Sequence, residues 1–132
     1  MRSQIELRVY YEDTDFSGRV YHASYLRFME RGRTEWLRER GYEHRQLQSQ
    51  SDLVFAVRGL QIEYFAPALM DDWLTIETVF AGPKGALLVY AQKVLRGAKV
   101  LTEATVTVVT ISGGKVIRPP KVLPARAVWG GA

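Results

Sequence analysis

One stretch of helical periodicity, in a chain that otherwise alternates, is the feature that most limits the fold of this sequence. From about Tyr21 to Arg40 apolar residues recur every three or four positions, which predicts an amphipathic helix of about five turns. An alternating strand precedes it at Ile5–Tyr11. The strands expected after the helix are Val54–Phe65, Trp73–Phe80, Leu87–Leu95 and Val100–Ile111. The predicted class is therefore α+β, with one antiparallel sheet packed on one helix.

Glycines mark a close contact and the ends of these elements. Gly32 lies in the apolar stripe of the predicted helix, where the missing side chain would let helix and sheet approach closely. Gly41 fits a C-terminal cap of the helix. No helix is predicted in the polar stretch Glu43–Asp52 or beyond it, and Gly113-Gly114 is expected to end the last long strand.

The length of 132 residues predicts a single domain, residues 1–132. Pro119, Pro120 and Pro124 prevent regular sheet, so residues 124–132 are expected to form a loosely held tail. No apolar run approaches the roughly 20 residues of a membrane helix. The start of the chain lacks the apolar core of a secretion signal. We therefore expect a cytoplasmic protein without a membrane span.

The composition excludes several kinds of site. The chain has no cysteine, which rules out disulfides and thiolate chemistry. Its two histidines, His22 and His44, lack a third nitrogen ligand, so no metal is predicted. No glycine-rich phosphate loop and no nucleophile-elbow serine are present, so no cofactor and no serine hydrolase triad are expected. The net charge of +4 is modest and spread out, and it fits phosphate-bearing small molecules as well as nucleic acid. Because the sequence has no helix-turn-helix, zinc-finger or aromatic sheet motif, ligand binding is favoured over nucleic-acid binding.

The segment ahead of the predicted helix carries the candidate chemistry. Asp15 follows the first strand among aromatic neighbours, so we expect partial desolvation to raise its pKa and make it a base or a nucleophile. His22 stands at the helix start, where unpaired backbone N–H groups can receive negative charge. The alternatives are that Asp13 and Asp15 only cap the turn, that His22 is a surface residue, and that Tyr11 is core. From the residues alone, capping is favoured for Asp13 and Asp15.

The motif as a whole resembles the hotdog-fold acyl-CoA thioesterases. Within them it is most similar to the branch of 4-hydroxybenzoyl-CoA thioesterase and the Tol-Pal-associated thioesterases. The resemblance rests on Tyr11-Glu12-Asp13-Thr14-Asp15, Gly18, Val20, Tyr21-His22, Tyr25 and Glu30-Arg31-Gly32-Arg33, with further similarity at Pro67-Ala68-Leu69-Met70-Asp71-Asp72 and near Arg118-Pro119-Pro120. It implies a curved five-stranded antiparallel sheet wrapped around the helix. It also implies a homodimer formed edge to edge, with dimers often pairing into tetramers.

The same resemblance assigns roles to the residues of the motif. It places Asp15 at the catalytic carboxylate position, as nucleophile or general base, His22 at a second functional position and Tyr11 at a supporting one. Asp13 matches a recurring noncatalytic residue, and Arg19 departs from the family pattern. The implied substrate is a short- or medium-chain or aromatic acyl-CoA, with acyl-carrier protein as an alternative carrier. Two other readings stay open: a noncatalytic thioester-binding module, and a hotdog dehydratase or hydratase.

Overall fold

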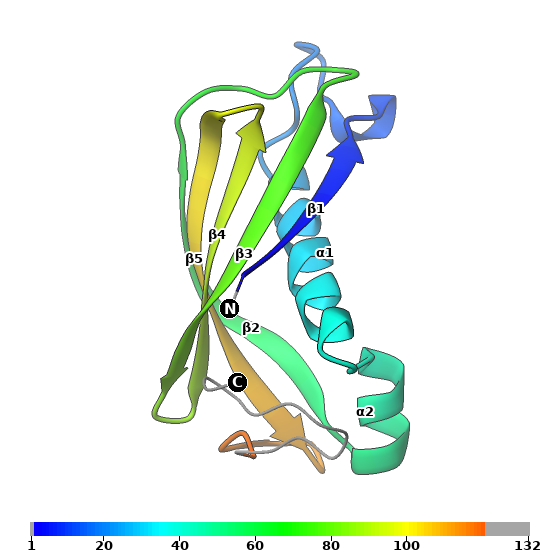
Figure 1. Ribbon diagram of the computed structural model, residues 1–132, viewed down its shortest axis with the longest axis vertical. Coiled ribbons are helices and arrows are strands. Elements are labelled where there is room, and N and C mark those ends of the chain that lie inside the picture. Colours follow the sequence, from blue (N-terminus) through cyan, green and yellow to red (C-terminus); the bar gives the residue numbers. More distant parts are fainter. Residues whose placement is uncertain (1, 121–132) are drawn as a thin grey trace.

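The computed structural model describes residues 2–120, which form an antiparallel sheet bent around one long helix (Figure 1). The helices are α1 (Ser24–Glu39) and α2 (His44–Ser51), with a short 3-10 turn at Tyr11–Asp13. The strands are β1 (Arg2–Arg8), β2 (Val54–Tyr64), β3 (Trp73–Lys84), β4 (Leu87–Arg96), β5 (Lys99–Ser112) and β6 (Lys115–Ile117). The predicted tail at 124–132 lies outside the described residues.

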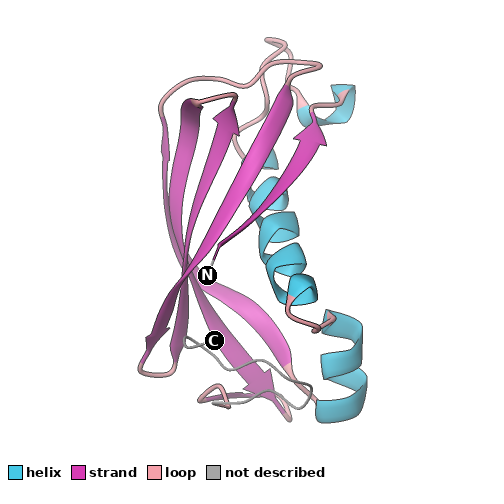
Figure 2. Cartoon of the chain, viewed as in Figure 1, coloured by secondary structure: helices cyan, strands magenta, loops and turns pink. Residues whose placement is uncertain are grey.

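The sheet has the order β1-β3-β4-β5-β2, and β6 pairs with β5. All strand pairs are antiparallel, so β1 and β2 form the two edges. Register shifts interrupt the ladders between Val57 and Gly59 and between Phe80 and Gly82. Such bulges bend a strand and increase its twist, which lets the sheet curve around α1 (Figure 2).

The core lies between α1 and the inner face of the sheet, as the helical period of one segment and the alternation of the strands predict. The helix buries its apolar stripe, and β3 buries every second residue against it. Trp36 of α1 packs on Phe80 and Tyr90, with ring centroids 5.3 and 5.4 Å apart. Leu26, at the edge of the stripe, is 38% exposed.

Gly32 lies where the helix comes closest to the sheet, which confirms the predicted close approach. A Cβ atom at this position would lie 2.6 Å from Thr78 Oγ1 and 3.0 Å from Gln92 Nε2. The Gln92 side chain itself donates to the Met29 carbonyl and to Thr78 Oγ1 at 2.9 and 2.8 Å. The contact therefore depends on glycine and on a buried hydrogen-bonded network.

Two elements were not predicted. The polar stretch contains α2, whose only buried residue is Leu47, and one apolar anchor produces no periodicity. The chain leaves α2 through Asp52 in a left-handed conformation. After the last long strand, Gly113-Gly114 adopts positive φ at both positions, which is the geometry of a two-residue hairpin turn into β6.

The first strand is also shifted relative to the prediction. It ends at Arg8 rather than Tyr11, because the chain turns into the 3-10 segment. The Asp13 carboxylate accepts the Tyr10 N–H at 2.9 Å and fixes this turn. The end of α1 agrees with the prediction: Gly41 has φ +88°, and the N–H groups of Gly41 and Tyr42 donate to Arg38 and Leu37, a Schellman cap.

Candidate active site

Asp15 lies in a tight loop between the 3-10 turn and α1, in the blue segment at the top of Figure 1. Its backbone N–H donates to the Arg19 carbonyl at 2.9 Å, and its carbonyl accepts the Gly18 N–H at 3.0 Å. Gly18 has φ +82°, which few other residues adopt readily. The loop therefore needs its glycine to return the chain toward α1.

The carboxylate of Asp15 is held by Ser17. Its Oδ1 atom accepts the backbone N–H of Ser17 at 2.8 Å and the Ser17 hydroxyl at 2.6 Å. These hydrogen bonds favour the charged form and hold the pKa of Asp15 below its usual value, with the Ser17 hydroxyl as the largest cause. The expectation of a desolvated carboxyl with a raised pKa was therefore wrong for the single chain, because the side chain is exposed and directly hydrogen-bonded.

Asp13 joins this loop to the start of the helix. Its side chain is buried and faces Arg27 at 3.5 Å, while its carbonyl accepts the Tyr21 N–H at 2.9 Å and the Ser24 hydroxyl at 3.1 Å. The segment just before Asp15 is thereby tied to the segment just before His22. Asp13 caps the 3-10 turn and Asp15 caps its own loop through the Ser17 N–H, as the residue pattern favoured. Neither is the N-cap of α1, which is Ala23.

His22 lies two residues before α1. Among the described residues, the backbone N–H groups of His22 and Ala23 donate to no acceptor. The Tyr64 hydroxyl donates to the His22 carbonyl at 2.9 Å. Because the peptide group is planar and trans, this bond also orients the Ala23 N–H on its opposite side. The helix start thus presents free, oriented donors at the positive end of the helix dipole.

Asp15 and His22 line one cleft of about 330 Å³. The structure brings these two predicted residues together but leaves Tyr11 outside, with a side chain that is 81% exposed. Four further lining residues belong to the sequence motifs of the family resemblance, although no role was predicted for them: Arg19, Val20, Tyr25 and Pro67. The remaining lining residues, Tyr64, Phe65 and Ala66, were not predicted. No motif marked Tyr64, the last residue of β2, or Phe65, which follows it.

The described residues contain no group of three histidine, aspartate or glutamate side chains suited to a metal ion. In the same part of the chain, neither helix has both the length and the apolarity to cross a bilayer.

Comparison with known proteins agrees with this geometry. A family model described as the thioesterase superfamily matches residues 17–103. The acyl-CoA thioesterase YbgC of Haemophilus influenzae is 44% identical over 110 residues, covering 83% of this chain and 81% of that protein. The acyl-CoA thioester hydrolase YbgC of Escherichia coli is 42% identical over 123 residues, covering 92% of this chain and 90% of that protein.

A solved structure is similarly close. The crystal structure of a probable thioesterase from Bartonella henselae matches with a TM-score of 0.87 and 41% sequence identity, covering 91% of this chain and 100% of that chain. The sheet bent around α1 is thus the predicted hotdog fold, and the chain belongs to the thioesterase superfamily.

Proposed function

We propose that this protein is an acyl-CoA thioesterase that hydrolyses short- or medium-chain or aromatic acyl-CoA, with Asp15 as its catalytic carboxylate. The observation that carries the proposal is that the Asp15 carboxylate and the helix start at His22, with its unpaired N–H groups, border the same cleft. The relatives described as acyl-CoA thioesterases cover most of the chain. Hydrolysis gives the free acid and CoA.

Thioester hydrolysis needs a carboxylate held at a fixed distance from the carbonyl carbon of the thioester. The lowered pKa of Asp15 keeps this carboxylate ionised at neutral pH, ready to attack or to take a proton from water. The thioester oxygen would lie against the backbone N–H of His22, where charge developing on it is stabilised. Tyr11 stays a sequence prediction, because its exposed side chain does not reach the cleft.

Asp15 has two possible roles. As nucleophile, its oxygen bonds to the thioester carbon, CoA leaves as thiolate, and water cleaves the mixed anhydride. As general base, it removes a proton from the attacking water. Single-turnover hydrolysis in heavy-oxygen water tests the nucleophilic role: label in the Asp15 carboxylate supports it, because water then opened the mixed anhydride at the Asp15 carbonyl. Label only in the released acid fits attack of water at the acyl carbon in either role.

We also propose that the protein acts as a homodimer joined through β2. This strand is an edge of the sheet, and it exposes Val57, Leu60 and Tyr64, apolar or aromatic residues that an unpaired edge rarely leaves open. A second copy pairing with β2 would cover them. Pairing of dimers into tetramers, acyl-carrier protein as a carrier and the cytoplasmic location stay predictions from the sequence.

Release of free thiol from a series of acyl-CoA substrates tests the proposed activity. CoA release that increases with enzyme concentration supports a hydrolase. Binding of the thioester without release would identify a noncatalytic module, and a change in the acyl group without release would identify a dehydratase or hydratase. Either result would overturn the proposal.

A further inference from the structure

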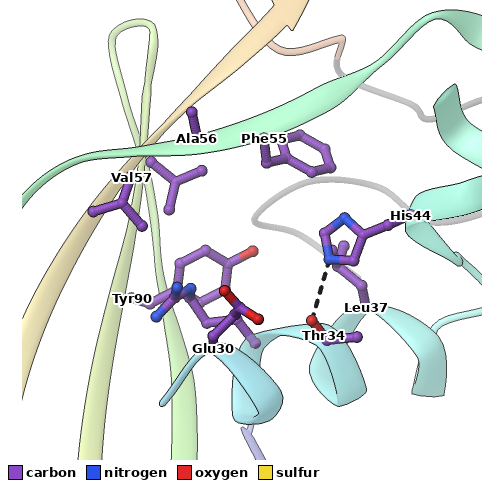
Figure 3. Close-up of a pocket in the computed structure, with 10 residues that line it drawn as sticks. Glu30, Thr34, Leu37, His44, Phe55, Ala56, Val57 and Tyr90 are labelled. Atoms are coloured by element: carbon purple, nitrogen blue, oxygen red, sulfur yellow. Dashed lines mark hydrogen bonds between the residues drawn. The ribbon is translucent and has the colours of Figure 1, made fainter. Parts of the chain in front are cut away.

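A second hollow, of about 330 Å³, lies farther along α1, between the helix, the start of α2 and β2 (Figure 3). We call it the Tyr90 pocket. Five residues with polar groups line it together with apolar side chains: Glu30, Arg33, Thr34, His44 and Tyr90. No residue of the Asp15 cleft belongs to it. The pocket is therefore a separate feature that the proposed chemistry does not use.

The Tyr90 hydroxyl is an unsatisfied donor in this pocket. The side chain is only 3% exposed, yet within the described part of the chain its hydroxyl makes no hydrogen bond. Figure 3 shows it directed into the hollow. Burial raises the pKa of Tyr90 well above its ordinary value, so the hydroxyl keeps its proton at all physiological pH values. The hydroxyl is not one of the enclosed side-chain atoms without a partner, so it meets the open space of the pocket, where a ligand oxygen can accept from it.

Arg33 adds a second donor beside Tyr90. Its Nη1 atom donates to Gln92 Oε1 at 3.0 Å, and the buried hydrogen bonds of Gln92 fix that partner in place. Burial lowers the pKa of the guanidinium, yet no carboxylate among the described residues lies within 4.0 Å of it. A partly buried cation with no carboxylate in direct contact can still pair with an anion that enters the pocket.

None of the other polar groups that line the pocket forms an ion pair with Arg33 within 4.0 Å. His44 contacts Thr34 Oγ1 through Nε2 at 3.3 Å, and burial lowers its pKa, which favours the neutral ring. Glu30 is exposed and forms no ion pair with Arg33 within 4.0 Å, although its charge acts on the guanidinium and partly offsets the lowering of the Arg33 pKa by burial. The buried end of the pocket therefore presents Tyr90 and Arg33 as donors, a set suited to a carboxylate.

An apolar hollow leads from the catalytic end of the molecule to this pocket. It has a volume of about 220 Å³, and Leu26, Met29, Leu60 and Val106 line it. It shares Arg33 and other lining residues with the Tyr90 pocket and none with the Asp15 cleft. Its lining residues on β2 and α1, Leu60 and Leu26, stand between those of the Tyr90 pocket and those of the Asp15 cleft along both elements. Along α1 the order is thus catalytic cleft, apolar hollow and donor pocket.

We propose that the Tyr90 pocket binds the terminal carboxylate of an ω-carboxyacyl group whose thioester lies at Asp15. The inference rests on the proposed function and names its substrate class: the mono-CoA thioester of a medium-chain dicarboxylic acid. The apolar hollow would hold the methylene chain between the two ends.

The length of the helix between the two sites sets the length of the acyl chain that can span them. Ten residues separate Ala23 from Arg33, or roughly 15 Å at 1.5 Å per residue, and helical side chains lean back toward the N-terminus. An extended chain gains about 1.2 Å per bond. A substrate of about 8–12 carbons therefore spans the distance.

The test compares two CoA thioesters at each length from 6 to about 14 carbons, one ending in a methyl group and one in a carboxylate. For the wild-type protein, the ratio of kcat/KM for the carboxylate substrate to that for the methyl substrate is expected to be greatest at about 8–12 carbons. Arg33→Gln and Tyr90→Phe should each lower that ratio about 10- to 100-fold, the usual range for a hydrogen bond to a charged group. Arg31→Gln, which removes an exposed arginine of the same helix that lines none of the three hollows, is the matched control and should leave the ratio unchanged.

A ratio below one at every length, or equal losses for both substrates in Arg33→Gln and Tyr90→Phe, would overturn the inference. Binding of free decanedioic acid, measured by calorimetry, gives a readout that needs no catalysis. Asp15→Asn should retain this binding and Arg33→Gln should lose it. Dicarboxylate binding without any thioester hydrolysis would refute the proposed function while leaving the pocket assignment standing.

Discussion

At the scale of single residues, the state of Asp15 is set by its immediate hydrogen bonds rather than by burial. Ser17 supplies both bonds to the carboxylate, and its hydroxyl contributes the larger share of the lowered pKa. The chain therefore keeps the proposed catalytic carboxylate ionised by local turn geometry. A carboxylate held in this way is stabilised in its charged form before substrate arrives.

Replacing Ser17 with alanine removes the hydroxyl but retains the backbone donor. The pKa of Asp15 should rise, because a bond to its charged form is lost. Activity that needs ionised Asp15 is present above that pKa and disappears as the pH falls through it, so the acid limb of kcat/KM should move to higher pH. pH-rate profiles of Ser17→Ala and of the control Ser49→Ala, an exposed serine on α2, measure this. An acid limb that stays in place would mean that Asp15 does not control it.

At the scale of elements, the contact between α1 and the sheet depends on Gly32. Alanine is the better helix former by about 1 kcal/mol, but here its methyl group would meet Thr78 and the hydrogen-bonded Gln92. Overpacking of this kind costs about 1–3 kcal/mol. We expect Gly32→Ala to lower the free energy of unfolding by about this amount in urea titrations at fixed protein concentration.

Gly59→Ala is the matched control for this substitution. Gly59 has no positive φ, and an added Cβ there would meet no atom within 4 Å. Its stability should stay within about 0.5 kcal/mol of the wild type. Equal stability of both variants and the wild type would show that helix and sheet can separate enough to admit a methyl group.

The elements that could be predicted well from the sequence are those in which a hydrophobic periodicity extends over many residues. The stripe of α1 and the alternation of β3 to β5 locate the core and the order of the long elements. The helix α2 and the strand β6 escaped prediction because a single buried leucine and a three-residue strand carry no period. The end of β1 was missed because a side-chain bond from Asp13, rather than the hydrophobic pattern, turns the chain.

The candidate site was predicted in part for a similar reason. Asp15 and His22 stand close together in a recognisable motif, and they line one cleft. Tyr64 joins them through the fold, because β2 runs back past the start of α1, and no local pattern marks a residue brought in from 42 positions away. The prediction that the pKa of Asp15 is raised was wrong, because the apolar neighbours in the sequence do not bury the carboxylate.

At the scale of the whole molecule, the open edge of β2 leads us to expect an oligomer. Two of its exposed apolar residues, Val57 and Leu60, line the apolar hollow, so a second copy covering this edge would also close the proposed substrate groove. Light scattering coupled to size exclusion should give about twice the 15.0 kDa mass of the chain, or a multiple of that dimer. A monomer at micromolar concentration would argue against pairing through β2.

The most direct test of the central claim, that the Asp15 carboxylate drives thioester cleavage, is CoA release by Asp15→Asn. The amide keeps an oxygen that can accept from Ser17, so the loop should fold unchanged. Asp71→Asn is the control, because Asp71 is exposed and its φ of +70° is one that asparagine also adopts. The account predicts that Asp15→Asn loses at least about 100-fold in kcat, while Asp71→Asn releases CoA at the wild-type rate. Wild-type turnover by a correctly folded Asp15→Asn protein would contradict it.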